Sequence, residues 1–383
     1  MPNDHDFMQQ AIDLAKCGHY TTHPNPRVGC VITRDEQIIA EGYHQRAGQP
    51  HAEINALNQL TEKGLNALGA TAYVTLEPCS HFGRTPPCAN ALIDSGINRV
   101  VIAMQDPNPN VSGRGIQRLK EAGIEVLVGV HEAAAQALNI GFIQRMQYQR
   151  PWVRVKMAMS LDGRTAMASG ESQWITGAEA RQDVQYGRAA SAAILSTAAT
   201  VIADNASLNV RLTANDLSIM GNVRQPVRII LDQHARLSAD LKLFSCAGEL
   251  WLLHHEAYSD AFKEQVKQYA ETTKVTYIKT PLNEQQQLDL PWILAELGRR
   301  EVNSVWVEAG KGVGGALLDE NLVDELIIYM APHLMGDTAQ GLFHLNDRQK
   351  MSDRIELAIN NIQPVGRDWK ITAYPQPKVS SSC

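Results

Sequence analysis

The sequence predicts two consecutive α/β domains. Its 383 residues suit about two domains at roughly 100–200 residues each. Strand-type and helix-type hydrophobic patterns alternate along the chain, as in sheets covered by helices. The segment YQRPW at 148–152 ends one such series, and a second series begins at once. We therefore expect domains at 1–148 and 149–375, followed by a Pro-, Ser- and Lys-rich tail at 376–383 that we expect to be disordered.

The first series opens with apolar residues at helical spacing, including Phe7, Ile12 and Ala15. Two strand patterns separated by the polar residues 34–37 then predict a hairpin. The order of elements indicates one mixed sheet covered by helices. In order, we expect a helix at 7–15, strands at 28–33 and 38–42, a helix at 52–60, a strand at 71–76, a helix at 88–95, a strand at 99–104, a helix at 115–122, a strand at 124–130 and a helix at 132–147.

The second series has the same alternation. Strands are expected at 152–159, 192–196, 227–232, 249–254, 274–279, 303–308, 324–331 and 369–374. Helices are expected at 178–189, 258–271, 291–300 and 313–321.

Composition excludes several classes of protein. The net charge is −6, and residues 1–148 and 149–383 each contribute −3, so neither half has the basic excess that nucleic-acid binding requires. The sequence has no run of about eighteen apolar residues, which is the length that a membrane-spanning helix needs. The N-terminus is acidic rather than signal-like, and the six cysteines are widely spread, which favours a cytoplasmic protein with reduced thiols.

Three short strings in the first domain carry metal-binding residue types: PHAE at 50–53, EPC at 77–79 and PPC at 86–88. His51, Cys79 and Cys88 supply three ligands, the number expected of a catalytic Zn2+ ion that keeps a fourth position for water. The prolines before Cys88 suit the first turn of a helix, where the positive helix end favours a thiolate. These strings therefore predict a zinc site.

Glu53, two residues after His51, is the expected catalytic residue. It would take a proton from the zinc-bound water, pass it to a ring nitrogen and then protonate the leaving amine. The strings resemble the H-x-E…P-C-x-x-C signature of zinc-dependent nucleobase deaminases, except that eight residues separate Cys79 from Cys88. The alternative is a structural zinc with a fourth protein ligand, for which His81 or His44 is available.

Longer strings identify a family. THPNPRVGC at 22–30, EPCSHFGRTPPC at 77–88 and DPNP at 106–109 closely resemble the bifunctional deaminase/reductase of riboflavin biosynthesis. The resemblance implies a cytidine-deaminase-like, three-layer αβα fold for the first domain. It also implies hydrolysis of the 2-amino group of 2,5-diamino-6-(5-phosphoribosylamino)pyrimidin-4-one, and the wide cysteine spacing is the family's own.

A phosphorylated substrate suits the loop between the two cysteines. Arg84 offers a planar donor fork for a phosphate, although a solvated surface charge is the alternative. His81 and Asn108 are expected to contact ribose or phosphate. Asn25, between two prolines, is expected to hold a polar edge of the pyrimidine.

The second domain contains the glycine-rich segment EAGKGVGG at 308–315, between an apolar strand and a helix. Gly310, Gly312 and Gly315 fit G-x-G-x-x-G, but the acidic pair 324–325 precedes the next strand instead of ending it, which argues against a full Rossmann unit. A bare backbone at a helix N-terminus still suits a phosphate. A structural tight turn is the alternative.

The strings KMAMSLDGR at 156–164 and GESQWIT at 170–176 resemble the reductase half of the same family. The resemblance implies a dihydrofolate-reductase-like α/β fold that uses NADPH to reduce the ribosyl group of the deaminated product to ribityl. The implied cofactor contacts are Ala158, Trp174, Thr200, Asp204, Gly310, Lys311, Gly312, Val313 and Gly314. The implied substrate contacts are Ser172, Arg188, Leu208, Arg211 and Glu308.

Within this half, Arg188 and Arg211 are suitable phosphate partners. Lys156 and Glu308, at strand ends, are candidates to position or protonate the opening ribose ring, whereas Asp162 is interpreted as a turn residue. The family resemblance also implies a homo-oligomer, a dimer or tetramer formed through the reductase half. The alternative function is a salvage cytidine-type deaminase fused to a folate-type reductase.

Overall fold

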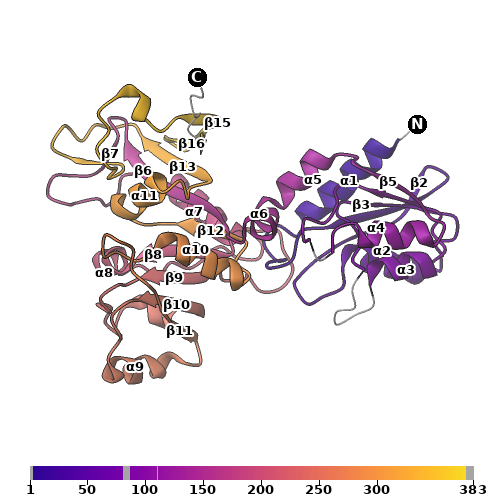
Figure 1. The fold of residues 1–383 in the computed structure, drawn as a ribbon, viewed down its shortest axis with the longest axis horizontal. Coiled ribbons are helices and arrows are strands. Elements are labelled where there is room, and N and C mark those ends of the chain that lie inside the picture. The colour runs from indigo at the N-terminus through magenta and orange to yellow at the C-terminus, as the bar shows by residue number, and fades with distance from the viewer. Residues whose placement is uncertain (1–2, 81–86, 110, 377–383) are drawn as a thin grey trace. The chain divides into compact units, whose positions relative to one another are not determined.

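The computed structural model describes residues 3–80, 87–109 and 111–376. The chain divides into two compact units, Met1–Gln149 and Arg150–Cys383, which are described separately (Figure 1). Within the described ranges, no helix has the length and apolar character needed to cross a membrane.

The first unit contains one mixed sheet with strand order β2-β1-β3-β4-β5. Strands β3, β4 and β5 run parallel, and β1 is antiparallel to both of its neighbours. Its elements are α1 (Asp4–Lys16), β1 (Gly29–Arg34), β2 (Gln37–Tyr43), α2 (Ala52–Glu62), β3 (Thr71–Val74), α3 (Cys88–Asp94), β4 (Arg99–Ile102), α4 (Arg114–Glu121), β5 (Glu125–Val128), α5 (Glu132–Leu138) and α6 (Ile140–Tyr148).

Two strand glycines show how helices cover both faces of this sheet. Gly42 pairs with Cys30 and therefore faces the side opposite to that of Gly29, because neighbouring residues of a strand alternate in direction. A Cβ atom on Gly29 would overlap the backbone of α1 at Ala11, whereas one on Gly42 would overlap α2 at Ala52. The helices α1 and α2 thus lie on opposite faces, and the unit has the expected three-layer αβα arrangement.

The predicted helix at 132–147 is wrong as a single element, because Asn139 divides it into α5 and α6. The Asn139 side chain is buried, and its amide pairs with the backbone of Arg27: Oδ1 accepts from the N–H at 2.8 Å and Nδ2 donates to the C=O at 2.9 Å. This tertiary bond competes with helix continuation. It also fastens the chain that leads from Asn25 into β1.

The second unit contains a nine-stranded sheet with order β11-β10-β9-β8-β12-β6-β13-β16-β15, and a small sheet of β14 and β7. The strands from β11 to β13 run parallel, and β16 and β15 are antiparallel. Its elements are β6 (Trp152–Ser160), β7 (Arg164–Ala166), α7 (Ala178–Ala190), β8 (Ala193–Thr197), α8 (Ala198–Asp204), β9 (Val227–Leu231), β10 (Gly248–His254), α9 (Asp260–Val266), β11 (Thr273–Lys279), α10 (Leu290–Arg299), β12 (Ser304–Val307), α11 (Lys311–Asp319), β13 (Glu325–Ala331), β14 (Gln340–Gly341), β15 (Leu357–Val365) and β16 (Asp368–Pro375).

Alternate residues of the central strands enter different hydrophobic clusters. Leu195 and Ile229 belong to a cluster with α10 and α11, whereas their neighbours Ile194 and Ile230 belong to one that includes Phe262 of α9. This alternation shows that helices cover both faces of the sheet. Because β8, β12 and β6 are parallel neighbours, their carboxyl ends meet at one edge of the sheet.

In the described part of this unit, sequence patterns missed one α-helix and three strands and overextended one helix. The helix expected at 258–271 is α9 followed by a 3-10 turn at Lys267–Tyr269. Helix α8 is too short for a periodic pattern, and β7 and β14 are shorter still. Strand β15, with the sequence LAINNIQPV, is exposed along nearly all its length and so lacks the alternation of a half-buried strand.

Candidate active sites

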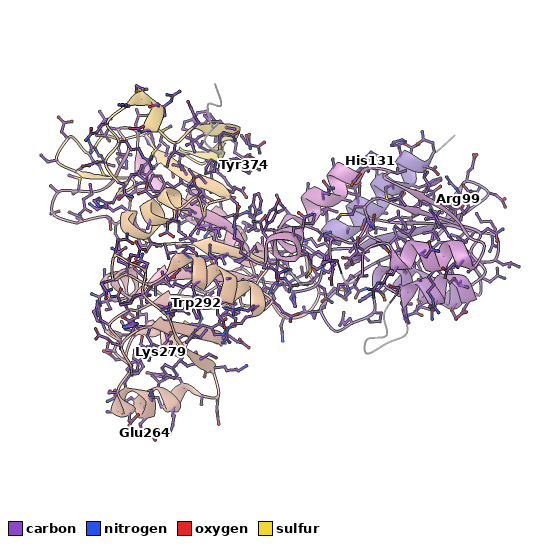
Figure 2. All side chains as sticks on the ribbon, in the orientation of Figure 1. Arg99, His131, Glu264, Lys279, Trp292 and Tyr374 are labelled. Carbon is purple, nitrogen blue, oxygen red and sulfur yellow. The ribbon has the colours of Figure 1, made fainter. Side chains whose placement is uncertain are left out.

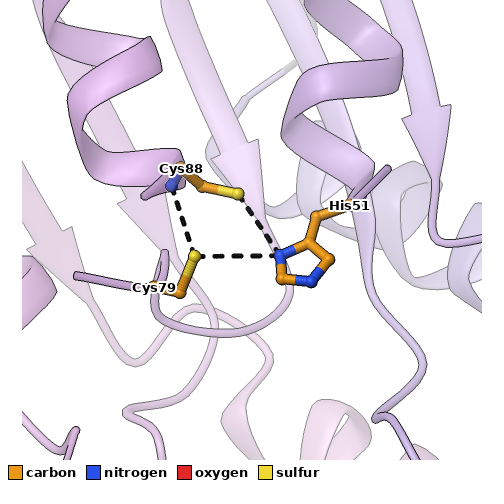
Figure 3. A group of neighbouring side chains, drawn as sticks. All are labelled: His51, Cys79 and Cys88. Atoms are coloured by element: carbon orange, nitrogen blue, oxygen red, sulfur yellow. Dashed lines mark hydrogen bonds between the residues drawn. The ribbon is translucent and has the colours of Figure 1, made fainter. Parts of the chain in front are cut away.

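Three predicted zinc ligands converge in the first unit. His51 is the N-cap of α2, Cys79 follows β3, and Cys88 is the first residue of α3, directly after Pro87 (Figure 3). The two Sγ atoms lie 3.8 Å (Cys79) and 3.4 Å (Cys88) from Nδ1 of His51. In a tetrahedral zinc site, sulfur and nitrogen ligands lie about 3.6 Å apart. The donor atoms therefore fit one zinc ion.

The protonation of the two thiols supports the same assignment. Hydrogen bonds from the Cys88 thiol, from His51 and from the Cys88 backbone N–H lower the pKa of Cys79. The neighbouring Cys79 and burial raise the pKa of Cys88. Two adjacent thiolates would repel each other, and a divalent cation bound between them would remove this repulsion.

Glu53 lies beside this cluster on the first turn of α2. Its side chain is buried, and Oε2 has no hydrogen-bond partner among the described residues. Burial raises the pKa of Glu53 to about 7. A carboxyl group that is neutral or ionised with similar ease near pH 7 suits proton transfer in both directions.

His44 is a functional candidate that sequence reasoning considered only as a zinc ligand. Its Nδ1 lies 3.0 Å from the carbonyl oxygen of Pro50, and its Nε2 lies 3.0 Å from Nδ2 of Asn25. A carbonyl only accepts, so Nδ1 carries the proton and Nε2 accepts from the Asn25 amide. These bonds orient the oxygen of Asn25 as the acceptor that remains for another group. They also occupy both ring nitrogens of His44, which argues against His44 as a fourth zinc ligand.

Two of the predicted substrate contacts of the first unit, His81 and Arg84, lie outside the described residues. Asn108 lies in the turn after β4, where its backbone N–H donates to Asp106 Oδ1 at 2.8 Å.

In the second unit, Arg188 and Glu308 form a buried, bidentate ion pair. Nε and Nη2 of Arg188 lie 2.5 and 2.8 Å from the two carboxylate oxygens, and Trp306 Nε1 donates to the same carboxylate at 3.0 Å. Burial by itself would raise the pKa of Glu308. Arg188, Lys156 and Trp306 lower this pKa by more than burial raises it, and the result is a pKa of about 2. Glu308 therefore stays ionised at neutral pH, and the prediction that it could protonate the ribose does not fit this geometry.

The same pair changes the role expected of Arg188. Its guanidinium also donates to the Asn209 carbonyl at 2.9 Å, so all three nitrogens already have partners. Arg211 is exposed to solvent. The partial burial of its guanidinium and the positive charge of Arg188 lower its pKa. Arg211 is thus better placed than Arg188 to meet a phosphate.

Lys156 of β6 belongs to the same group of charges. Burial and the positive charge of Arg188 lower the pKa of Lys156, while Glu308 raises it. An ammonium with a lowered pKa releases its proton more readily, so Lys156 fits the role of proton donor better than Glu308 does.

The glycine-rich segment separates into open and packed positions. A Cβ atom at Gly310 or Gly312 would meet nothing within 4 Å, whereas one at Gly315 would overlap the carbonyl of His344. Gly310 is the N-cap of α11, and Lys311, Gly312 and Val313 form its first turn, whose N–H groups lack intrahelical partners. The open glycines suit a phosphate, and Gly315 permits close packing.

The remaining predicted residues of this unit lie near the carboxyl edge of the sheet or on exposed segments. Trp174 is 69% exposed, and Arg181 lies over its ring at 4.7 Å. Gln173 donates to Asp204 at 2.8 Å, which ties the segment containing Ser172 and Trp174 to the end of α8.

Other predicted residues are placed as follows. Thr200 is in the first turn of α8, and Ala158 lies on β6 opposite Tyr329. Leu208 is buried and has a positive φ of 51°, so its backbone rather than its side chain is the part available to a ligand. Asp162 accepts from the backbone N–H groups of Met335 and Gly336, as suits a turn residue.

Comparison with known proteins identifies both units. Residues 1–104 match the zinc-binding region of cytidine and deoxycytidylate deaminases, and residues 151–371 match the RibD C-terminal domain. The riboflavin biosynthesis protein RibD of Escherichia coli K12 is 48% identical over 370 residues, covering 95% of this chain and 97% of that protein.

Two solved structures agree with this assignment over almost the whole chain. Acinetobacter baumannii RibD superposes with a TM-score of 0.88 at 44% identity, covering 98% of this chain and 99% of the other. A Thermotoga maritima protein, described as a diaminohydroxyphosphoribosylaminopyrimidine deaminase/5-amino-6-(5-phosphoribosylamino)uracil reductase, superposes with a TM-score of 0.83 at 34% identity, covering 97% and 99%. The chain therefore belongs to the RibD family of bifunctional riboflavin-biosynthesis enzymes and joins a zinc-binding deaminase domain to a reductase domain that uses a nicotinamide cofactor.

Proposed function

We propose that the chain first deaminates 2,5-diamino-6-(5-phosphoribosylamino)pyrimidin-4-one and then reduces the ribosyl group of the product to ribityl. The observation that carries this proposal is the buried Glu53 carboxylate, whose Oε2 has no hydrogen-bond partner among the described residues, beside the cluster of His51, Cys79 and Cys88. The description of the Thermotoga relative supports both the substrate and the order of the two steps. The fused salvage enzyme is not favoured, because RibD relatives match both units together.

In the deaminase site, each side chain has a distinct task. Zinc, when bound by His51, Cys79 and Cys88, supplies a water molecule that ionises near neutral pH. Glu53 accepts one proton from this water and transfers it to the ring nitrogen. It then takes the remaining proton from the hydroxyl group added to the pyrimidine and gives it to the leaving amine. Asn25, oriented by His44, holds a donor group of the pyrimidine through its amide oxygen. His81, Arg84 and Asn108 contact the phosphoribosyl group.

In the reductase site, we take NADPH as the hydride donor. The N–H groups at the start of α11 and the open glycines Gly310 and Gly312 receive its phosphates. The other cofactor contacts are Ala158, Trp174, Thr200, Asp204, Lys311, Val313 and Gly314.

The ribose side of the reductase site uses the charged group around Glu308. Lys156 donates the proton as the hydride arrives. Glu308 forms the ion pair with Arg188 and stabilises the positive charge of Lys156. Arg211 meets the phosphate, and Ser172 and Leu208 complete the contacts to substrate.

We further propose that the protein acts in the cytoplasm, where NADPH is kept reduced. We also propose that two or more copies of the chain associate through the β15–β16 hairpin. Strand β15 is an edge of the sheet, and the hairpin exposes Leu357, Ile359, Ile362 and Trp369 by 41–61%. An exposed apolar edge strand is an unfavourable surface in a monomer, and a second copy would cover it. Light scattering of Ile359→Lys against wild type tests this, since an unchanged mass would refute it.

The function is tested by following ammonia and NADPH together in one reaction. Purified zinc-loaded enzyme is incubated with the phosphoribosyl diaminopyrimidine, with and without NADPH. Ammonia release without NADPH, followed by NADPH oxidation only after deamination, is the expected result. Ammonia without NADPH consumption would overturn the reductase assignment, and neither signal would overturn the substrate.

A further inference from the structure

We propose that Glu77 is a positioning residue of the deaminase site, which fastens the substrate-binding turn and the start of α4 to the chain that carries a zinc ligand. The inference deepens the proposed function, and it rests on the deaminase reaction assigned there. Glu77 lies two residues before Cys79, and its side chain is only 3% exposed. Its carboxylate faces four backbone N–H groups from the chain that follows β4.

The four hydrogen bonds divide between two structures. Oε2 accepts from Asp106 at 3.1 Å and from Gly113 at 2.9 Å, and Oε1 accepts from Gly115 at 2.8 Å and from Ile116 at 3.2 Å. The Asp106 bond fixes the turn at 106–109, in which Asn108 lies. The other three bonds fix the first turn of α4.

Glu77 also performs the task of a missing helix cap. The N-cap of α4 is Gly113, with φ of +80° and no side chain to accept from the first-turn N–H groups. Those groups carry the partial positive charge of the helix end, so a carboxylate supplied from elsewhere in the chain is favourable there. Glu77 therefore stabilises the start of α4 as a distant cap.

The absence of a side chain at Gly115 permits a close approach between the start of α4 and Glu77. A Cβ atom on Gly115 would overlap the carbonyl of Pro78 and would lie 3.2 Å from Cγ of Glu77. The start of α4 is thus held directly against the Glu77-Pro78 peptide. Because Cys79 follows in the chain, one buried carboxylate determines where the metal ligand and the Asn108 turn stand relative to each other.

A carboxylate suits this position better than an amide. It offers about four acceptor sites and no donor, which matches four N–H groups. Glutamine would keep one acceptor oxygen and present an NH2 group to N–H donors, which leaves buried donors unsatisfied. Glu77→Gln therefore removes about half of these hydrogen bonds with almost no change in volume.

The test uses the full-length zinc-loaded enzyme. We expect Glu77→Gln to raise the deaminase KM by about tenfold with a smaller fall in kcat, because the substrate turn is displaced while Glu53 is untouched. Zinc content and the rate of the reductase step, assayed with the deaminated product, should remain at wild-type values. The matched control is Glu125→Gln, because Glu125 is an exposed carboxylate of the same sheet. This substitution should leave the deaminase KM, kcat and zinc content at wild-type values.

Coupling to Asn108 separates positioning from a general structural role. If Glu77 acts through the turn, Asn108→Ala should cost much less in the Glu77→Gln background than alone, whereas independent effects on KM would multiply. Glu77→Asp keeps the charge but shortens the reach, so it should recover part of the loss. Hydrogen exchange should quicken at residues 113–116 in Glu77→Gln.

The possible outcomes separate the proposed deaminase function from the positioning role of Glu77. An inactive wild-type enzyme would refute the proposed function, while hydrogen exchange would still report on the hydrogen bonds of Glu77. An active wild type with unchanged KM and exchange in Glu77→Gln would overturn the positioning role. Loss of zinc together with activity would also overturn it, because Glu77 would then act on the metal site as a whole.

Discussion

Replacement of Glu308 by glutamine is a sharp test of the charge arrangement in the reductase unit. Glu308 receives two hydrogen bonds from Arg188 and one from Trp306, and the side chains of the ion pair are only 10% and 14% exposed. Glutamine keeps the size of the side chain but removes the charge. Arg188 would then be left as a buried cation without its counterion, which is the costly way to break such a pair.

The magnitude follows from the pKa of Glu308, which falls from the ordinary value of 4.5 to about 2 in the folded chain. A shift of that size corresponds to about 3 kcal/mol of the free energy of unfolding at pH 7. Because the folded-state pKa is the lower one, this contribution is complete above about pH 5 and is lost as the pH falls toward 2. At pH 3, about 1 kcal/mol of it should remain.

The chain offers a specific fluorescence assay. All six tryptophans lie between residues 152 and 369, so tryptophan emission reports the unfolding of the reductase unit alone. Guanidinium unfolding of Glu308→Gln and wild type should differ by about 3 kcal/mol at pH 7 and by about 1 kcal/mol at pH 3. The control is Glu256→Gln, whose partner His234 is on the surface, with both side chains more than half exposed.

Activity provides a second measurement on the same variant. NADPH oxidation should fall by about tenfold to a hundredfold in Glu308→Gln, since a charge-assisted contact is lost, while ammonia release should not change. The reasoning would be refuted if Glu308→Gln unfolded like Glu256→Gln at pH 7, or if the stability difference grew as the pH fell.

Four further changes test other parts of the structure. Gly315→Ala should destabilise the reductase unit by about 1–3 kcal/mol, because its methyl group overlaps the His344 carbonyl, whereas Gly312→Ala should leave the unfolding midpoint unchanged and raise the KM for NADPH; equal midpoints would contradict this. Glu53→Gln should keep one zinc ion per chain and slow ammonia release by at least about a hundredfold, and a variant that retained activity would remove Glu53 from the mechanism. Chelation of zinc should stop ammonia release without affecting the reduction of added deaminated product by NADPH, which NADPH consumption measures directly. Asn139→Ala should raise the deaminase KM through the loss of its two bonds to Arg27, measured against unchanged reductase activity.

Most of the architecture could be predicted from the sequence because it depends on local periodicity. The helices and strands of the core, such as α2 and β6, have apolar residues at regular intervals. Strand β15 could not be predicted, since its stability comes from pairing with β16 and not from a buried face. The break between α5 and α6 was also missed, because it depends on a bond between Asn139 and Arg27, more than a hundred residues apart.

The candidate sites divide in a similar way. The identity of the zinc ligands and of Glu53 follows from short strings, because ligand chemistry and helix starts are local properties. The bonds that orient these groups are not local: His44 positions Asn25, and Glu77 positions the turn at Asn108. Residue type alone likewise predicts a phosphate contact for Arg188, whereas the fold gives it Glu308 as a partner.

By itself, the sequence determined two α/β domains, the family, and the residue types that perform the chemistry. The tertiary structure alone decided which charges pair, which glycines lie open to a phosphate and which ones serve packing, and which buried acceptor holds each loop. The physical reason is that burial sets the energy of a charge or an unsatisfied hydrogen bond, and burial depends on segments that are distant in the chain. Glu53 and Glu308 show this clearly, because surroundings alone bring the pKa of one glutamate to about 7 and that of the other to about 2.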